Sequence, residues 1–272
     1  MIRRHYQPAG LFTRSSSLLA SSLGMIAIVL LYLPIAGLAL LSFSAQPLRG
    51  IPWPFTFEWY GALVAGETAS KWISPLLTSI SIGILVSIAS TATALLIGRA
   101  VPTLRRSTGL LVAYLCVIVL PGILVGVAVL LFYRVLLGLT TGFWSVFLVH
   151  FIWALPFSLL CILIVTLRFD RRLLDAAEDL GASKFRQFID IELPLLMPGV
   201  MASLFFSFLL SFNELPRTLY ARGSVVTLPY YVWTASSSHS SQVSLIYALS
   251  SIIMVLSFLV TLVAMRILNK RE

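Results

Sequence analysis

The sequence predicts an all-α membrane protein with six transmembrane helices and with both termini on the cytoplasmic side. Three observations support this prediction. Of the 272 residues, 59% are hydrophobic and only 11% are charged, and the mean hydropathy is +0.99, which is too apolar for a soluble domain. The apolar residues form six runs, each long enough to cross a hydrocarbon layer of about 30 Å. The basic residues fall mostly on alternate connections between these runs.

The six expected spans lie at residues 19–43, 76–98, 110–133, 143–167, 199–219 and 245–268. The first span follows a basic segment, as the apolar region of a signal peptide does, but it is longer and no cleavage site stands out. We therefore expect an uncleaved span after a cytoplasmic tail at 1–18, with a second tail at 269–272. A polar, aromatic loop is expected over 44–75, with a short surface helix near 57–64.

The distribution of arginine and lysine predicts the orientation of the spans. Fourteen of the nineteen basic residues fall on segments that share a side with the N-terminus, and five fall on the opposite side. Connections rich in arginine and lysine stay on the cytoplasmic side of a membrane. The net charge of +9 therefore indicates topology and contact with anionic lipid headgroups, and not binding to nucleic acid.

The most charged segment lies between the fourth and fifth spans, at residues 170–198, and is called the charged loop below. It carries six of the ten acidic residues of the chain. Asp170 is expected to cap a short first helix, whose apolar and acidic residues fall on opposite faces. Gly181 is expected to end this helix in a left-handed conformation.

The second half of the charged loop predicts another short helix, capped by Ser183 and running from Lys184 to about Ile189. Pro194 and Pro198 are expected to prevent its simple continuation into the fifth span. Two small amphipathic helices between membrane spans present a surface to a partner in water, although an ordinary amphipathic loop would have a similar composition.

Motifs for chemistry within the chain itself are absent from the sequence. It contains no GxxxxGK[ST] phosphate-binding loop, no HExxH or GxSxG motif and no cluster of cysteine and histidine. Cys116 and Cys161 lie inside apolar runs, where cysteine is usually a packing residue. We therefore expect no enzymatic activity, no metal site and no cofactor bound to this chain.

Polar and aromatic residues near the outer end of the fifth span are candidates for lining a solute path. Glu214 is costly at membrane depth unless it faces water or has a partner. It either pairs with Arg217, three residues later, or serves as a carboxylate of the path. The other candidates for the walls of the path are Phe212, Asn213, Tyr220 and Trp233.

Three further residues inside the expected spans have two alternative roles each. His150 in the fourth span either makes a hydrogen bond to a neighbouring helix or lines the path. Pro121 and Pro156 each leave a carbonyl without its helical donor, which produces either a flexible hinge or a static kink. Both prolines are therefore candidate hinges.

The charged loop resembles the EAA loop of permease subunits in bacterial binding-protein-dependent ABC importers. The resemblance rests on Asp175-Ala176-Ala177, then Gly181, then Ile191-Glu192-Leu193-Pro194, at the spacing of that motif. Asp175 stands where most relatives have glutamate, so the carboxylate is kept. In that family the loop is a coupling helix that docks on a cytoplasmic ATPase. The residues implied in ATPase coupling are Asp175, Ala176, Ala177, Glu178, Asp179, Gly181, Arg186, Ile191, Leu193 and Pro194.

Most of the chain resembles the second permease subunit of spermidine/putrescine importers. The segments that carry this resemblance are Leu120-Pro121-Gly122, Ser211-Phe212-Asn213-Glu214 and Thr227-Leu228-Pro229. It implies a type I ABC importer permease fold, with a coupling helix between the fourth and fifth spans, and a polyamine as the solute. Because Asn213 replaces a carboxylate of many relatives, and Arg217 and Arg222 lie nearby, opines, aminophosphonates, thiamine and ferric iron stay open as solutes.

The same resemblance implies the partners of this chain. They are a homologous second permease subunit, two copies of an ABC ATPase that bind ATP and magnesium, a solute-binding protein and membrane lipid. The chain would form half of a translocation path in the bacterial cytoplasmic (inner) membrane. A passive channel or a scaffold subunit is the alternative that needs no ATPase. A membrane-embedded enzyme would require clustered catalytic groups, which the sequence lacks.

Overall fold

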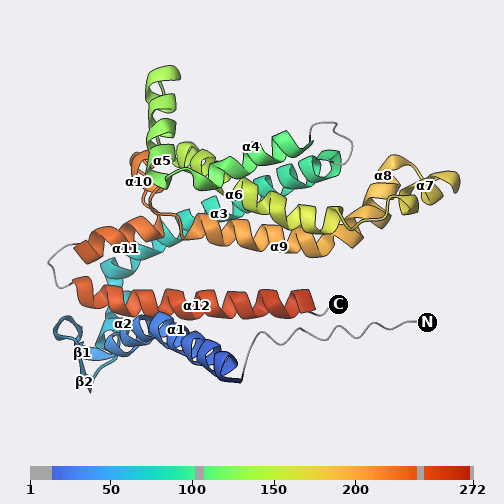
Figure 1. The fold of residues 1–272 in the computed structure, drawn as a ribbon. Coiled ribbons are helices and arrows are strands. Elements are labelled where there is room, and N and C mark those ends of the chain that lie inside the picture. Colours follow the sequence, from blue (N-terminus) through green and yellow to red (C-terminus); the bar gives the residue numbers. More distant parts are fainter. Residues whose placement is uncertain (1–13, 102–106, 238–241, 270–272) are drawn as a thin grey trace. The chain divides into compact units, whose positions relative to one another are not determined.

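The computed structural model describes residues 14–101, 107–237 and 242–269 (Figure 1). In chain order its elements are α1 (Arg14–Leu41), β1 (Ser44–Gln46), the 3-10 turn η1 (Pro47–Arg49), β2 (Ile51–Phe55), α2 (Glu58–Val64), α3 (Gly66–Ala100), α4 (Ser107–Val119), α5 (Gly122–Leu131), the π-helical turn η3 (Phe132–Leu136), α6 (Phe143–Thr166), α7 (Arg172–Asp179), α8 (Lys184–Arg186), the π-helical turn η4 (Gln187–Glu192), α9 (Leu193–Phe212), α10 (Thr218–Ala221), α11 (Leu228–Ser237) and α12 (Gln242–Asn269). Contacts divide the chain into two units. The smaller holds α1, β1, β2 and the start of α12, and the larger holds α3 to α11.

Four helical segments of the described residues are long and apolar enough to cross a membrane. They are Leu19–Leu41, Thr68–Ala100, Phe143–Thr166 and Lys184–Phe212. The pair α4 and α5 makes a fifth if it counts as one span. The apolar stretch found within α12, Val243–Leu259, is shorter. The mainly helical fold is therefore confirmed, while six crossings and their orientation stay predictions.

Three long helices, α3, α6 and α9, pack against one another and form the centre of the larger unit (Figure 1). Small residues allow the close approach, since a Cβ on Gly199 would lie only 2.4 Å from Cγ2 of Val165. A hydrogen bond of 2.8 Å between the hydroxyls of Thr91 and Ser203 joins α3 to α9. Small residues and hydroxyl bonds are how membrane helices associate without a hydrophobic driving force.

The third expected span is broken, and not merely kinked. Helix α4 ends at Val119 and α5 begins at Gly122, and the two are bent by 104°. Pro121 lies between them in an extended conformation with φ −57° and ψ 127°, because it has no N–H to continue the helix. Pro156, in contrast, lies inside the continuous helix α6. Movement at either proline stays a prediction.

Helix α9 differs from the expected fifth span at both ends. Helix α9 begins at Leu193 and ends at Phe212, so it starts before and stops short of the expected 199–219. Pro194 and Pro198 do not interrupt the helical run. The reason is the π-helical turn η4, which changes the hydrogen-bond register just before Pro194, so that this proline falls in the first turn of α9, where its missing N–H is tolerated.

The start of the chain also differs from the expectation. Helix α1 begins at Arg14, so the last part of the expected tail is helical, while residues 1–13 and 270–272 lie outside the described residues. Helix α3 begins at Gly66, which makes the polar loop shorter than the expected 44–75. Within this loop, β1 and β2 form an antiparallel hairpin that the sequence did not predict, because the prolines of β2 disfavour a strand. The short surface helix is confirmed as α2.

Candidate functional site

The charged loop folds by the local rules that its sequence obeys. Asp170 Oδ1 accepts a hydrogen bond from the N–H of Arg172 at 3.0 Å, at the start of α7. Gly181 ends the helix with a φ of 82°. Its N–H donates to the carbonyl of Glu178 at 2.8 Å, and the N–H of Ala182 donates to the carbonyl of Ala177 at 2.9 Å. This is a Schellman motif, so the expected left-handed end at Gly181 is confirmed.

The corner between α7 and α8 is closed by polar contacts. Ser183 Oγ accepts the N–H of Arg186 at 3.4 Å, as expected of a cap, and Lys184 forms a salt bridge with Glu178. Both partners of this salt bridge are mostly exposed, so it contributes no more than about 1 kcal/mol. The corner therefore owes its shape mainly to the backbone at Gly181.

Two large apolar side chains project from this corner. Leu180 is 90% exposed and Phe185 is 74% exposed, although both lie in the most charged part of the chain. The acids around them, Asp175, Glu178 and Asp179, are exposed as well. Apolar side chains ringed by charge are typical of a surface that a partner covers. The sequence feature that could have indicated these two residues is that they flank the expected corner at Gly181.

The ten residues implied in coupling are therefore spread over both faces of the loop. Ala177 is buried and Ile191 and Leu193 are half-buried, so these three hold the loop together. The exposed members are Asp175, Ala176, Glu178, Asp179, Gly181, Arg186 and Pro194. Only these exposed members are available to a partner that docks on the loop.

Arg99, at the end of α3, attaches both the start and the later part of the charged loop to that helix. Its Nε donates to Glu192 Oε1 at 2.8 Å, and its guanidinium carbon lies 4.5 Å from the centre of the Phe188 ring. Arg171, at the start of the loop, donates to the carbonyl of Arg99 at 3.2 Å. Glu192 is buried, so its carboxylate would be costly without this partner. We call these contacts the Arg99 clamp. No pattern in the sequence indicated that these residues meet.

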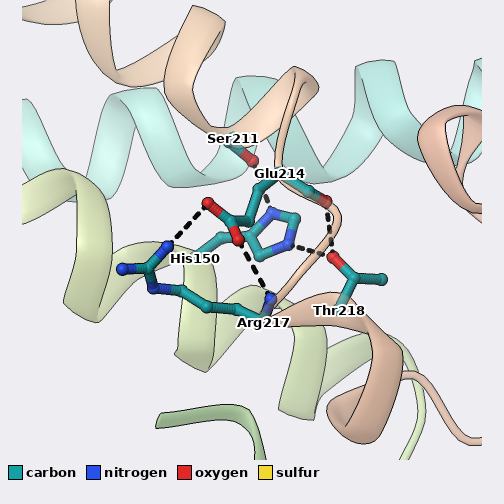
Figure 2. Close-up of polar contacts among 5 residues, drawn as sticks. All are labelled: His150, Ser211, Glu214, Arg217 and Thr218. Carbon is teal, nitrogen blue, oxygen red and sulfur yellow. Dashed lines mark hydrogen bonds and ion pairs between the residues drawn. The ribbon is translucent and has the colours of Figure 1, made fainter. Parts of the chain in front are cut away.

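A second polar cluster lies where α9 ends and α10 begins (Figure 2). Glu214 and Arg217 are both 6% exposed. Arg217 Nη1 donates to Glu214 Oε2 at 2.9 Å, and the N–H of Arg217 donates to the other carboxylate oxygen at 3.0 Å. Of the two alternatives for Glu214, the pair with Arg217 is the one that the structure shows. A role for Glu214 in a solute path stays a prediction.

His150 of α6 joins this cluster through both ring nitrogens (Figure 2). Nδ1 lies 2.9 Å from Ser211 Oγ, and Nε2 lies 2.8 Å from Thr218 Oγ1. The Thr218 hydroxyl donates to the carbonyl of Glu214 at 2.7 Å, so it accepts a hydrogen bond from His150. A neutral imidazole with its proton on Nε2 satisfies all three groups. The hydrogen-bonded alternative for His150 is therefore observed, and a path-lining role stays a prediction.

Arg217 occupies a tight space between α5 and α6. Its guanidinium carbon lies 3.6 Å from the centre of the Trp153 ring. A Cβ on Gly122 would lie 2.9 Å from Arg217 Nη1, and one on Gly126 would lie 2.6 Å from the Arg217 carbonyl oxygen. The spacing of these two glycines was a sequence signal for close helix approach, but it named no partner. Arg217 thus connects α5, the second half of the broken α4–α5 pair, to the segment that follows α9.

The remaining path candidates lie at the end of α9, in α10 and in α11. The ring of Phe212 stacks on Phe208 with 5.7 Å between centroids. Asn213 Nδ2 donates to the carbonyl of Leu209 at 3.0 Å. Tyr220 and Trp233 are exposed. Among the residues that the structure describes, no group of three or more His, Cys, Asp or Glu side chains could hold a metal ion.

The sequence is similar to known proteins over most of its length. Residues 90–272 match the family described as "Binding-protein-dependent transport system inner membrane component". The chain is 32% identical over 241 residues to the spermidine/putrescine transport system permease protein PotC of Escherichia coli K12, which covers 85% of this chain and 87% of the relative. It is 29% identical over 247 residues to PotC of Haemophilus influenzae, covering 89% and 93%. It is 26% identical over 217 residues to the putrescine transport system permease protein PotI of E. coli K12, covering 75% of each.

The family match contains both polar sites described above, the charged loop with its Arg99 clamp and the cluster around Glu214 and Arg217. The apolar helices agree with a multi-pass protein of the bacterial inner membrane. The chain belongs to the family of inner membrane components of binding-protein-dependent transport systems, the permease subunits of ABC importers.

Proposed function

We propose that this chain forms half of the translocation path of an ATP-driven importer for spermidine or putrescine. The observation that carries the proposal is the charged loop, which exposes Leu180 and Phe185 among acids in a chain of the permease family. The polyamine assignment is supported by the relatives, which are spermidine/putrescine and putrescine transport permeases. ATP hydrolysis belongs to a partner, since the sequence has no phosphate-binding loop.

The proposed architecture is a type I importer permease with six spans over residues 19–268 and both termini in the cytoplasm. The distribution of basic residues supports this orientation, which places the charged loop at 170–198 on the same side as ATP. The proposed assembly pairs this chain with a homologous permease subunit and adds two ATPase subunits and a solute-binding protein.

The proposed mechanism uses the charged loop as a lever. The ATPase binds the exposed corner around Gly181, and closure of the ATPase dimer on ATP pulls this corner. The movement reaches α6 and α9 along the chain, and it reaches α3 through the Arg99 clamp. ATP thereby biases the spans between two packed states. Pro121 and Pro156 are the proposed points at which the spans bend.

The residues proposed to line the solute path carry little charge. Phe212, Tyr220 and Trp233 offer ring faces that attract an amine cation, and Asn213 offers an amide. Glu214 is already neutralised by Arg217, and this pairing is the observation that favours a second candidate. An opine or an aminophosphonate carries anionic groups of its own and would not require a free carboxylate at this place, whereas thiamine and ferric iron are cations that this pairing does not favour.

Uptake by the complete importer in proteoliposomes tests the proposed function. With binding protein outside and ATP inside, labelled spermidine is expected to accumulate, and unlabelled putrescine is expected to compete. An ATPase subunit without hydrolytic activity serves as the control. Uptake that needs no ATP would indicate a passive channel, and competition by an opine but not by putrescine would reassign the solute.

The Arg99 clamp gives a prediction about coupling. Arg99→Glu places two carboxylates side by side, because Glu192 is buried at the end of the loop. Loss of a charged hydrogen bond costs about 1.5–3 kcal/mol, which lowers the ratio of clamped to unclamped loops by roughly tenfold or more. The amount of solute transported per ATP hydrolysed is expected to fall with it. The exchange Arg99→Glu with Glu192→Arg is expected to restore part of this ratio. Arg168→Glu, at an exposed arginine that follows α6, is the matched control. A wild-type ratio for Arg99→Glu would remove the clamp from the mechanism.

A further inference from the structure

We propose that the β1–β2 hairpin is a membrane-interface anchor, which lays one face of β2 among the phospholipid headgroups at the end of the first span. The large apolar side chains that β2 exposes are Ile51, Trp53 and Phe55, and we call them the aromatic face of the strand. Trp53 is 61% exposed and Phe55 is 51% exposed, and their ring centroids are 4.2 Å apart. A hairpin surrounded by water is expected to expose polar side chains, so this aromatic face indicates a contact with an apolar or interfacial environment.

Chain continuity places the hairpin at the membrane surface. The apolar part of α1 ends at Leu41, and β1 begins at Ser44. The segment after β2 is also bonded back to the start of the hairpin, because the N–H of Thr56 donates to the carbonyl of Phe43, two residues after α1, at 2.7 Å. Trp59 Nε1 of α2 donates to the carbonyl of Ser44 in β1 at 2.8 Å. The hairpin therefore cannot swing away from the place where the helix leaves the hydrocarbon layer.

Rings extend this attachment on the side of α2. Phe43 lies 5.5 Å from Phe57 and stacks on Tyr60 at 5.1 Å between centroids. The Tyr60 hydroxyl lies 2.7 Å from Ser42 Oγ. The hairpin, the helix end and the start of α2 thus form one packed block, and the aromatic face of β2 is exposed on it.

The composition of the hairpin fits lipid headgroups. Tryptophan is enriched at the membrane interface, where its ring is accommodated with a polar edge toward water. Arg49 at the turn is exposed and donates to Gln46 Oε1 at 3.0 Å, so the turn of the hairpin is charged and polar, in contrast to the aromatic face. Two of the five residues of β2, Pro52 and Pro54, have no backbone N–H that an apolar environment would leave unpaired. This proposal depends neither on the solute nor on the orientation of the spans.

Spin-label accessibility tests the anchor in the complete importer, reconstituted in nanodiscs of phosphatidylethanolamine and phosphatidylglycerol. The free cysteines Cys116 and Cys161 are first replaced by alanine. A nitroxide is then attached at Trp53→Cys, or at Phe55→Cys, which keeps Trp53 in place. Both labels are expected to be more accessible to oxygen, which partitions into lipid, than to a water-soluble nickel complex. The matched control is Arg49→Cys at the turn, where the nickel complex is expected to have the greater access.

Two results would overturn the anchor. Greater access of the nickel complex than of oxygen at positions 53 and 55 would place the face in water. Protection from both reagents would show that protein covers it, and protection that appears only after the solute-binding protein is added would identify that protein as the partner. Uptake measured on each labelled importer shows that the hairpin variants are assembled.

Discussion

Replacement of Gly181 by proline is expected to eliminate solute uptake while the permease still reaches the membrane. Gly181 has a φ of 82°, whereas proline is restricted to a φ near about −65°. Proline also lacks the N–H that donates to the Glu178 carbonyl at 2.8 Å. A cost of about 3 kcal/mol lowers the fraction of loops with the docking corner by about 100-fold. Uptake and the amount of ATPase subunit that co-purifies with the permease measure the effect.

Gly181→Asn is the control for this variant. Asparagine tolerates the left-handed conformation better than other residues with a Cβ, keeps the N–H, and meets no atom within 4 Å of the new Cβ. It is expected to retain most of the uptake. Equal loss in the asparagine and proline variants would mean that position 181 acts through its side chain and not through the shape of the corner. Normal uptake with proline would end the assignment of the corner to ATPase docking.

Replacement of Arg217 by methionine is expected to cause the largest loss of stability of any single change considered for this chain. Methionine can keep the contact with Trp153, but it leaves the Glu214 carboxylate buried without its charge partner. Removal of one member of a buried ion pair costs about 3–5 kcal/mol. Thermal unfolding of the detergent-purified permease, together with its amount in the membrane, measures the loss.

The double variant Arg217→Met with Glu214→Gln separates the charge from the packing. Glutamine at position 214 still accepts the hydrogen bond from the backbone N–H of residue 217, and it carries no charge. The double variant is therefore expected to be more stable than Arg217→Met alone. If both variants unfold at the same temperature, the ion pair does not contribute and packing against Gly122 and Gly126 accounts for the loss.

Local rules explain which parts of the charged loop could be predicted from the sequence. The cap at Ser183 and the left-handed end at Gly181 depend on the chemistry of neighbouring residues, and both are present. The continuation through Pro194 could not be predicted in this way. It depends on the π-helical turn η4, whose wider register has no simple sequence pattern. Helix α9 therefore begins before the expected start of the fifth span.

Contacts between distant residues could not be predicted from the sequence for a different reason. The pair of Glu214 with Arg217 was one of two stated alternatives, because the two are three residues apart. The contact of His150 with Thr218 spans 68 positions, and the Arg99 clamp spans 93 positions. A single sequence carries no signal for which distant polar groups meet, since that depends on how the helices pack. Burial then decides which of these contacts matter for stability.

The docking of the charged loop on an ATPase is tested most directly by photo-cross-linking in the assembled importer. p-Benzoylphenylalanine in place of Phe185 keeps an aromatic ring at a position that is 74% exposed, and the same residue in place of Trp233, an exposed aromatic residue of α11, is the control. We expect a cross-link from position 185 to the ATPase subunit, and none from position 233. Cross-linking of position 185 to the solute-binding protein, or to no ATPase at all, would contradict it.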